Sequence, residues 1–292
     1  MQVDNRIASF FWNNFDFLIR MGYCKTGPIG KMVNDRLFWN LYSSDFRELD
    51  RRFEESASLL KKHGITIRDK VVLEIGPGNC YINAYNFLMC GAKKVILIDK
   101  FPRINKTEKQ KQYSKLEREY ISKKYNRPLF FINSQVNGKR IEFIEGDIIR
   151  TDVEEVDFIF TNSVLEHIKP IEETIKKMSS ILKPDGYILH NIDLRDHYNF
   201  NEPFLFYKYP EWVWKNLLTK EGLSYTNRLR YGDFVRLFKE NGLRIVAEKR
   251  RGKKLKSVRL CNKFSGKGKE DLETVYLSVL LEKLSYDEVS RE

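Results

Sequence analysis

Cysteine and histidine are both scarce in this chain, which has four of each among its 292 residues. The cysteines (Cys24, Cys80, Cys90 and Cys261) form no C-x-x-C pair, and no histidine cluster accompanies them. A structural zinc site needs several such ligands at close spacing, and a disulfide framework needs paired cysteines. We therefore exclude both as the basis of the fold, predict no metal site, and expect a reducing, cytoplasmic location.

Long hydrophobic runs are also missing. The most apolar N-terminal stretch, Phe10-Phe11-Trp12, is interrupted at once by Asn13, Asn14 and Asp16. We therefore predict neither a signal peptide nor a membrane span. An apolar content of 42% with 13% aromatic residues excludes a disordered chain and indicates a globular protein.

The net charge of +12 is confined to two segments. Arg103 to Arg127 has nine Lys/Arg and three Glu, and Lys249 to Lys269 has ten Lys/Arg and no acid. Such segments would attract a phosphorylated or polyanionic acceptor. They could equally be two solvated surface segments. Both contain few aromatic residues on which bases could stack, which disfavours a nucleic-acid partner.

A buried strand followed by a glycine turn organises the chain. Val71 to Ile75 is apolar apart from Glu74, and Gly76-Pro77-Gly78 follows directly. The next segment, Tyr81 to Cys90, has the composition of a buried helix. Strand, turn and helix are the first unit of a doubly wound sheet, and such a turn binds a nucleotide-like ligand.

The ligand is indicated by the following strand, Lys94 to Ile98, which ends at Asp99. This carboxylate lies 21 positions after Gly78, close to the spacing at which an acid meets ribose hydroxyls. Tyr81 occupies the place of the third glycine of a dinucleotide fingerprint. S-adenosylmethionine has no pyrophosphate to lay on a helix N-terminus, so it is favoured over a dinucleotide.

Four segments in order resemble the motifs of class I S-adenosylmethionine-dependent methyltransferases: Leu73–Gly78, Phe143–Ile148, Val156–His167 and Leu182–Leu189. The resemblance implies an α/β fold with a doubly wound, mostly parallel, seven-stranded sheet. It also implies S-adenosylmethionine as the cofactor.

The resemblance further implies roles for individual residues. Gly76, Pro77 and Gly78 would form the cofactor turn, and Asp99 would bind the ribose. Asp147, with the backbone of Ile148, would hold the adenine, and Asn162 and Ser163 would approach the methionine part through backbone atoms. Glu74 would accept the cofactor's amino group, or else satisfy backbone groups beside the turn.

Two regions are expected in the chain. Residues 1–64 would form an N-terminal helical cap, since apolar residues recur at helical spacing from Ile7 to Met21 and Ser44 can cap a helix from Asp45 to Lys62. Residues 65–292 would form the cofactor domain, with inserts at about 101–140 and 249–272. The first insert holds a charged helix, Thr107 to Tyr125, which could cover the adenosine.

The stretch from His190 to Tyr198, after the fifth predicted strand (Gly186 to His190), is the candidate acceptor loop. A hydroxyl needs a base to take its proton, and neutral histidine suits that work near pH 7. We expect His197 to be this base, with His190 and His167 as further candidates and Asp193 or Asp196 orienting a ring. Each histidine could instead be structural, and the same groups could hold a divalent cation.

Residues 160–245 resemble bacterial methyltransferases that modify polysaccharides and glycans, through Tyr209-Pro210-Glu211-Trp212 and Tyr225 to Arg230. This favours O-methylation of a carbohydrate or another small hydroxylated acceptor, anionic or neutral, in glycan or natural-product biosynthesis. Aromatic residues between 198 and 214 could stack on a sugar or form a buried cluster. A nucleic-acid methyltransferase using the basic inserts, a non-catalytic partner with this fold, and a homodimer stay open as alternatives.

Overall fold

The structure is a computed structural model of the 292-residue chain, and it describes residues 46–78, 80–100, 108–197, 202–218, 225–256 and 258–284. The predicted N-terminal helix, Ser44, Cys24, Asn79 and Tyr198 lie outside the described residues. Among the helices of the described part, none is long and apolar enough to cross a membrane.

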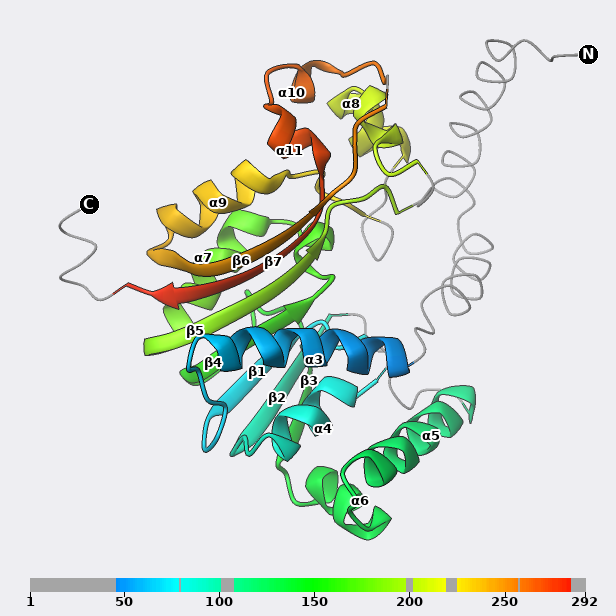
Figure 1. Ribbon diagram of the computed structural model, residues 1–292, viewed down its shortest axis with the longest axis vertical. Helices are drawn as coiled ribbons and strands as arrows, with labels where there is room; N and C mark the ends of the chain where they lie inside the picture. The colour runs from blue at the N-terminus through cyan, green and yellow to red at the C-terminus, as the bar shows by residue number, and fades with distance from the viewer. Residues whose placement is uncertain are drawn as a thin grey trace, which may run out of the picture.

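A seven-stranded sheet with the order β3-β2-β1-β4-β5-β7-β6 forms the centre of the protein (Figure 1). The strands are β1 (Val71–Ile75), β2 (Lys94–Asp99), β3 (Ile141–Glu145), β4 (Val156–Asn162), β5 (Leu182–Asp193), β6 (Leu243–Gly252) and β7 (Thr274–Lys283). Strands β1 to β5 pair in parallel, whereas β7 pairs antiparallel with both β5 and β6. The predicted doubly wound, mostly parallel sheet of seven strands is therefore confirmed, as a mixed sheet whose last two strands form an antiparallel hairpin.

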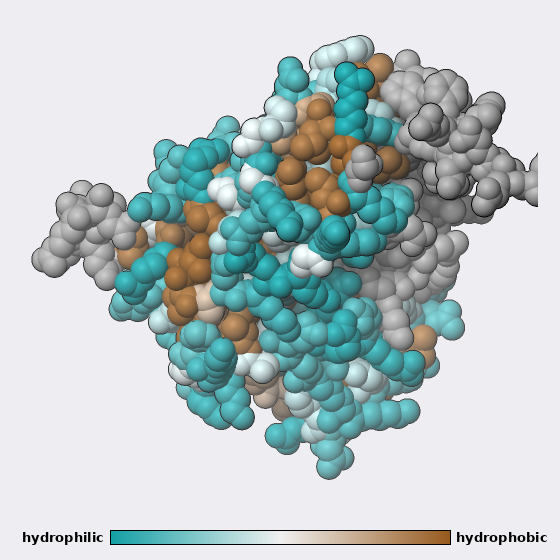
Figure 2. Space-filling view, turned by 45° about the horizontal axis from the view of Figure 1, so that its top comes forward, coloured by the Kyte–Doolittle hydropathy of each residue, from teal (hydrophilic) through white to brown (hydrophobic). Residues whose placement is uncertain are grey.

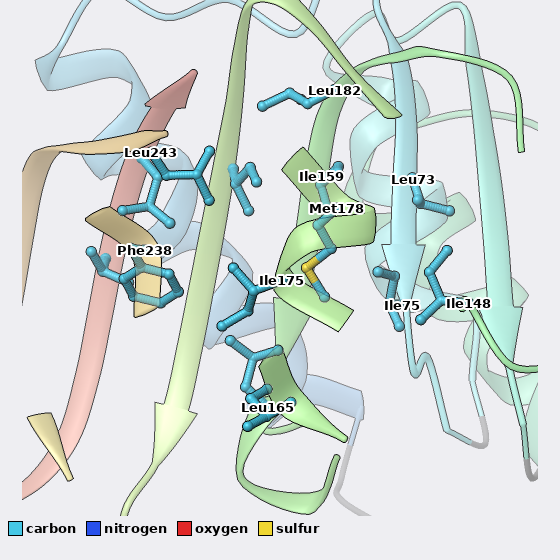
Figure 3. Close-up of a cluster of buried hydrophobic side chains, with 14 of the residues drawn as sticks. Leu73, Ile75, Ile148, Ile159, Leu165, Ile175, Met178, Leu182, Phe238 and Leu243 are labelled. Atoms are coloured by element: carbon cyan, nitrogen blue, oxygen red, sulfur yellow. The ribbon is translucent and has the colours of Figure 1, made fainter. Parts of the chain in front are cut away.

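Helices cover both faces of the sheet, as the near-continuous apolar sequences of β1, β2 and β4 require. On one face, α7 (Ile171–Ile181) and α9 (Tyr231–Glu240) pack onto the strands through a large apolar cluster. Figure 3 shows part of this cluster, with Met178 and Ile175 of α7 lying over Ile159 of β4. The other face is covered by α3 (Phe46–Lys62) and α4 (Ile82–Met89), with α5 (Glu108–Lys124) and α6 (Leu129–Asn137) beyond α4 (Figure 1).

Helix α3 packs into the same core as the strands. Phe53 lies edge-on against Phe87 of α4, with ring centroids 4.9 Å apart. Ser56, also buried on α3, accepts a hydrogen bond of 3.0 Å from the Asn191 side chain of β5. The predicted apolar stripe of this helix is thus laid against the sheet, as expected from its spacing.

Two elements differ from the sequence prediction. Strand β5 begins at Leu182 and ends at Asp193, so it is longer than the predicted segment from Gly186 to His190. Its extra residues pair with β7 as far as Asp193 and Tyr276, a partner that local sequence does not reveal. Helix α6 was not predicted. It begins after Pro128, whose missing N–H costs nothing at a helix start.

The second basic insert contributes to a small separate core. Phe264 of α10 (Asn262–Ser265) and Leu272 of α11 (Lys269–Glu273) are buried against aromatic residues of the segment after β5: Phe204, Phe206, Tyr207, Tyr209 and Trp214. This segment forms η2 (Leu205–Lys208), α8 (Glu211–Val213) and the π-helical turn η3 (Trp214–Leu218). Of the two interpretations of the aromatic residues, these five side chains fit the buried cluster. Trp212, which is 64% exposed, is outside it.

Half-buried apolar side chains extend this small core towards the surface, among them Val213, Leu217 and Leu260. In the view of Figure 2, apolar residues reach the surface in separate areas between hydrophilic ones. The second insert is therefore a packed part of the protein with a mixed surface.

Arg230 joins this small core to the sheet. Its side chain is fully buried and donates to the carbonyls of Leu194 at 2.6 Å and Asp271 at 3.1 Å, and also to that of Thr274. These carbonyls come from the end of β5, from α11 and from the start of β7. One guanidinium thus donates hydrogen bonds to buried backbone carbonyls of three different segments.

Replacing Arg230 by methionine should lower the free energy of unfolding by about 3 kcal/mol or more, because three buried carbonyls lose their donor at roughly 1–3 kcal/mol each. Urea denaturation followed by circular dichroism measures this. Arg236→Ala is the control, since Arg236 is an exposed arginine of the neighbouring helix α9 that pairs with Glu240. Equal midpoints for the two variants would contradict the role of Arg230.

Candidate functional site

The turn after β1 has a backbone that requires glycine. Gly76 has φ +69°, and a Cβ at this position would lie 2.7 Å from Cγ2 of Val164. Gly78 has φ +72°, and its N–H donates to Oδ2 of Asp99 at 3.1 Å. The N–H of Gly76 donates to the carbonyl of Ile98 at 2.8 Å. The predicted turn, with Pro77 between the glycines, is thus bonded to the end of β2, where Asp99 lies.

Glu74 is buried in β1 with one unsatisfied oxygen. Its Oε1 accepts a hydrogen bond of 2.7 Å from the side chain of Asn83, while Oε2 has no hydrogen-bond partner among the described residues. Burial raises the pKa of Glu74 to about 7; the Asn83 hydrogen bond opposes this and the charge of Asp99 adds to it. A buried carboxylate in this state accommodates a cationic group.

The end of β4 adds two more unsatisfied polar atoms. Oδ1 of Asn162 and Oγ of Ser163 are buried and have no hydrogen-bond partner among the described residues. Ser163 has φ +55°, and its N–H donates to the carbonyl of Asn191 on β5 at 2.7 Å. Because Ile75 of β1 is paired with Thr161 of β4, these atoms and Glu74 lie at the same edge of the sheet.

Asp147 lies at the far side of this edge, after β3. Burial alone would raise its pKa, but hydrogen bonds from the N–H of Ile149 at 3.1 Å and from Lys100 at 3.0 Å hold the pKa below its ordinary value. Asp147 therefore stays ionised, as an acceptor for an amino group must be. The side chain of Ile148 is buried in the core, so only its backbone can face a ligand.

These residues fit S-adenosylmethionine. An ammonium group would satisfy Oε2 of Glu74, and the ribose hydroxyls and adenine amino group have carboxylate acceptors at Asp99 and Asp147. The unsatisfied atoms of Asn162 and Ser163 lie at the end of β4, the strand next to β1 and its turn. The residues that sequence reasoning selected for the cofactor are thus brought together along one edge.

Glu117 of α5 is a residue near this site that sequence reasoning missed. Its fully buried carboxylate accepts a hydrogen bond of 2.8 Å from the N–H of Tyr81, at the start of α4. Burial raises the pKa of Glu117 to about 8. In the sequence this glutamate is one of several charges in a charged helix, and nothing there distinguishes it.

A second group of titratable residues lies where β4 and β5 end. Glu166 and His167 form the short turn η1 (Leu165–His167), Asp193 is the last residue of β5, and His197 follows in the loop. Oε1 of Glu166 accepts the N–H of Asp193 at 3.2 Å, and the rings of His167 and His197 have centroids 4.7 Å apart. Nε2 of His197 is 3.8 Å from Oδ1 of Asp193.

Arg195, which sequence reasoning did not select, completes this group. Its guanidinium donates to both carboxylate oxygens of Asp193, at 2.9 Å to Oδ1 and 2.6 Å to Oδ2. His167 is held from the other side, with Nδ1 at 2.7 Å from the carbonyl of Tyr225. We call Glu166, His167, Asp193, Arg195 and His197 the acceptor cluster.

Burial and mutual charge set the protonation of the acceptor cluster. Burial raises the pKa of Glu166 to about 8 and lowers that of His167 to about 3. Asp193 is buried too, but the hydrogen bonds from Arg195 and the nearby ring of His197 take its pKa well below the ordinary value. For His197, burial alone would lower the pKa, but the nearby acidic groups of Asp193, Glu166 and Asp196 outweigh this effect and raise it.

His190, a candidate base in the sequence analysis, lies outside the acceptor cluster. Its ring is fully buried on β5, 2.8 Å from the hydroxyl of Thr161 through Nδ1 and stacked on Phe238 of α9. Burial lowers its pKa to about 3. On a strand, alternate residues point to opposite faces, so His190 points towards α9.

A family model described as a methyltransferase domain matches residues 46–248 of the chain. A malonyl-[acyl-carrier protein] O-methyltransferase from Calditerrivibrio nitroreducens is 36% identical over 73 residues, which are 23% of this chain and 30% of that protein. The chain thus spans less than a third of the length of this curated relative.

Solved structures share the fold at low identity. A protein from Galdieria sulphuraria, assigned as a sarcosine dimethylglycine methyltransferase, matches with a TM-score of 0.52 and 15% identity, over 86% of this chain and 98% of that one. The 1,6-didemethyltoxoflavin-N1-methyltransferase from Burkholderia thailandensis, solved with S-adenosylhomocysteine, has a TM-score of 0.47 and 16% identity, over 98% and 92% of the two chains.

The raised pKa of Glu74 makes cofactor binding depend on pH. The ammonium group favours the ionised carboxylate, so affinity should be full above pH 7 and fall as pH drops below 7, roughly tenfold between pH 8 and pH 6. Calorimetric titration with S-adenosylhomocysteine, which keeps the ammonium group, measures this. Glu74→Gln should bind weakly at every pH; a variant with the pH dependence of the native protein would exclude Glu74 as the titrating group.

Asp99→Asn should weaken binding of S-adenosylhomocysteine by about 10- to 100-fold, because hydrogen bonds to a charged acceptor contribute roughly 1.5–3 kcal/mol. The amide oxygen can still accept the N–H of Gly78, so the turn should keep its shape. Asp152→Asn, at an exposed aspartate of the loop before β4, is the matched control. Unchanged affinity in Asp99→Asn would remove Asp99 from the ribose site.

Proposed function

The chain belongs to the methyltransferase domain family, and from this premise we propose that it methylates a hydroxyl oxygen of a carbohydrate or similarly small polar acceptor. It is an S-adenosylmethionine-dependent methyltransferase. The acceptor class and the roles of individual residues are our proposal.

When bound, the cofactor supplies an electrophilic methyl group on a positively charged sulfur. The task of the protein is to align an acceptor atom with that methyl, which can contribute roughly 7–11 kcal/mol to lowering the barrier. Glu74, the glycine turn and Asp99 would hold the donor, while Asn162 and Ser163 border it at the end of β4. The acceptor must then come from the side of β5, where the acceptor cluster lies.

The acceptor cluster is the observation that supports a hydroxyl acceptor. A hydroxyl becomes a strong nucleophile only as its proton leaves, and a positioned group that assists adds about 10²–10⁴-fold. The cluster brings two imidazoles and two carboxylates within reach of one another, next to the proposed donor site. We assign His197 to the acceptor side, with its ring held by Asp193.

A carboxylate acceptor fits this cluster less well. The curated relative is named for methylating malonyl-[acyl-carrier protein], but it matches over only a quarter of this chain. A carboxylate needs no proton removed.

A nucleic-acid acceptor is disfavoured by the pairing of the basic segments. In the second insert, Arg250 pairs with Glu270, Lys263 with Glu211 and Lys267 with Asp233. In the first, Lys124 pairs with Asp50 and Glu54 of α3 at 2.6 and 2.5 Å. These four cations are paired with carboxylates of the protein, so they are less available to phosphates.

The test is methyl transfer from labelled S-adenosylmethionine to panels of nucleotide sugars, free glycans and small hydroxylated metabolites. We expect a product whose label survives mild alkali, as a methyl ether does and a methyl ester does not. His197→Gln should lower kcat by roughly 10²–10⁴-fold with cofactor affinity unchanged, whereas His63→Gln, at an exposed histidine after α3, should match the native rate. Label found only in alkali-labile esters, in amines or in RNA would overturn the proposal.

A further inference from the structure

We propose that Glu166, His167 and His197 bind a divalent metal ion of the zinc class in the acceptor cluster. Each residue offers one ligand atom, and the three atoms lie within 4.8 Å of one another. Ligands of a tetrahedral ion at about 2.0–2.2 Å are roughly 3.5 Å apart, so small side-chain rotations would close the site around an ion.

One ligand is a buried carboxylate with an unsatisfied oxygen. Glu166 is 3% exposed, and its Oε1 accepts the N–H of Asp193, which fixes the carboxylate from one side. Its Oε2 is buried without a hydrogen-bond partner among the described residues. Leaving such an atom unsatisfied is costly, and an ion would satisfy it.

The two imidazoles are held by outer groups, as metal-bound histidines commonly are. Nδ1 of His167 is 2.7 Å from the Tyr225 carbonyl, which places the proton on Nδ1 and leaves Nε2 as a lone-pair donor. Asp193 lies beside the His197 ring and is itself fixed by Arg195. A backbone carbonyl bonded to one histidine and a carboxylate close to the other are both typical outer groups of a metal site.

The ligand types limit the choice of metal. Two imidazole nitrogens and one carboxylate oxygen form a common three-ligand set of catalytic zinc and related first-row ions, with a position left open. Mg²⁺ and Ca²⁺ prefer all-oxygen sites, so they are disfavoured here. The site has no cysteine, which explains why cysteine spacing did not indicate it.

The role of the ion rests on the proposed function. An ion in this position would take the acceptor hydroxyl at its open position and make that hydroxyl more acidic. His197 would then act on the acceptor through the metal. The binding site itself does not depend on which acceptor the enzyme uses.

The experiment uses the full-length protein without a histidine tag, stripped with a chelator and titrated with Zn²⁺ by calorimetry and with Co²⁺ by visible absorption. We expect one ion per chain with micromolar or tighter affinity and cobalt bands of a four- or five-coordinate site. His197→Gln and Glu166→Gln should each weaken binding at least tenfold while still binding S-adenosylhomocysteine, which shows that they are folded. His63→Gln removes a histidine outside the cluster and should bind metal like the native protein.

The outcomes separate this inference from the proposed function. No stoichiometric binding, or equal affinity in His63→Gln and His197→Gln, would overturn the metal site even if hydroxyl methylation is found. Binding with the expected variant pattern would support the site even if the acceptor proves to be another class. Methylation at the full rate by chelated protein would overturn the catalytic role of the ion.

Discussion

Burial of carboxylates at the carboxyl edge of the parallel strands is the constraint on which the site depends. Glu74 on β1 and Glu166 after β4 are both almost fully buried, and each has one oxygen that the described protein leaves unsatisfied. Burying an ionised acid without a partner costs several kcal/mol or forces it to take up a proton. No described residue donates a hydrogen bond to these two oxygens, so a ligand that did so would gain binding free energy at each position.

Sheet order brings the two groups of residues together. Strands β1 and β4 are neighbours, and β4 and β5 are neighbours in turn, although long stretches of chain separate them. The residues we propose for the donor therefore gather around β1 and β2, and those we propose for the acceptor around the end of β5, with Asn162 and Ser163 between. The antiparallel insertion of β7 beside β5 extends β5 as far as Asp193 and so fixes one member of the acceptor cluster.

Much of the fold could be predicted from local sequence because the glycine turn and apolar strands carry their own signals. Gly76 illustrates this, since its positive φ and its contact with Val164 both exclude a side chain. Histidines were harder. His190 and His197 are only seven positions apart in the sequence, but the pleat of β5 turns one into the core while the loop leaves the other beside Asp193. Which face a side chain takes depends on where the strand ends, and that is set by its pairing with β7.

Residues whose role depends on distant partners gave no sequence signal. Glu117 appears as an ordinary surface charge in the sequence, yet its carboxylate is fully buried and accepts the N–H of Tyr81, 36 positions away. The aromatic residues after β5 were ambiguous for the same reason. Their partners are in the second insert, far along the chain, and only tertiary contact distinguishes a packed cluster from a binding wall.

The carboxylate of Glu117 also limits how this scaffold can be modified. Helix α5 carries this carboxylate. If α5 were shortened or replaced by a loop, the N–H of Tyr81 would lose its hydrogen-bond acceptor close to the glycine turn. A graft at this position would need to bring its own buried acid. Changes to the sequence of this helix therefore affect the turn after β1, so they cannot adapt the protein to a new acceptor without also affecting that turn.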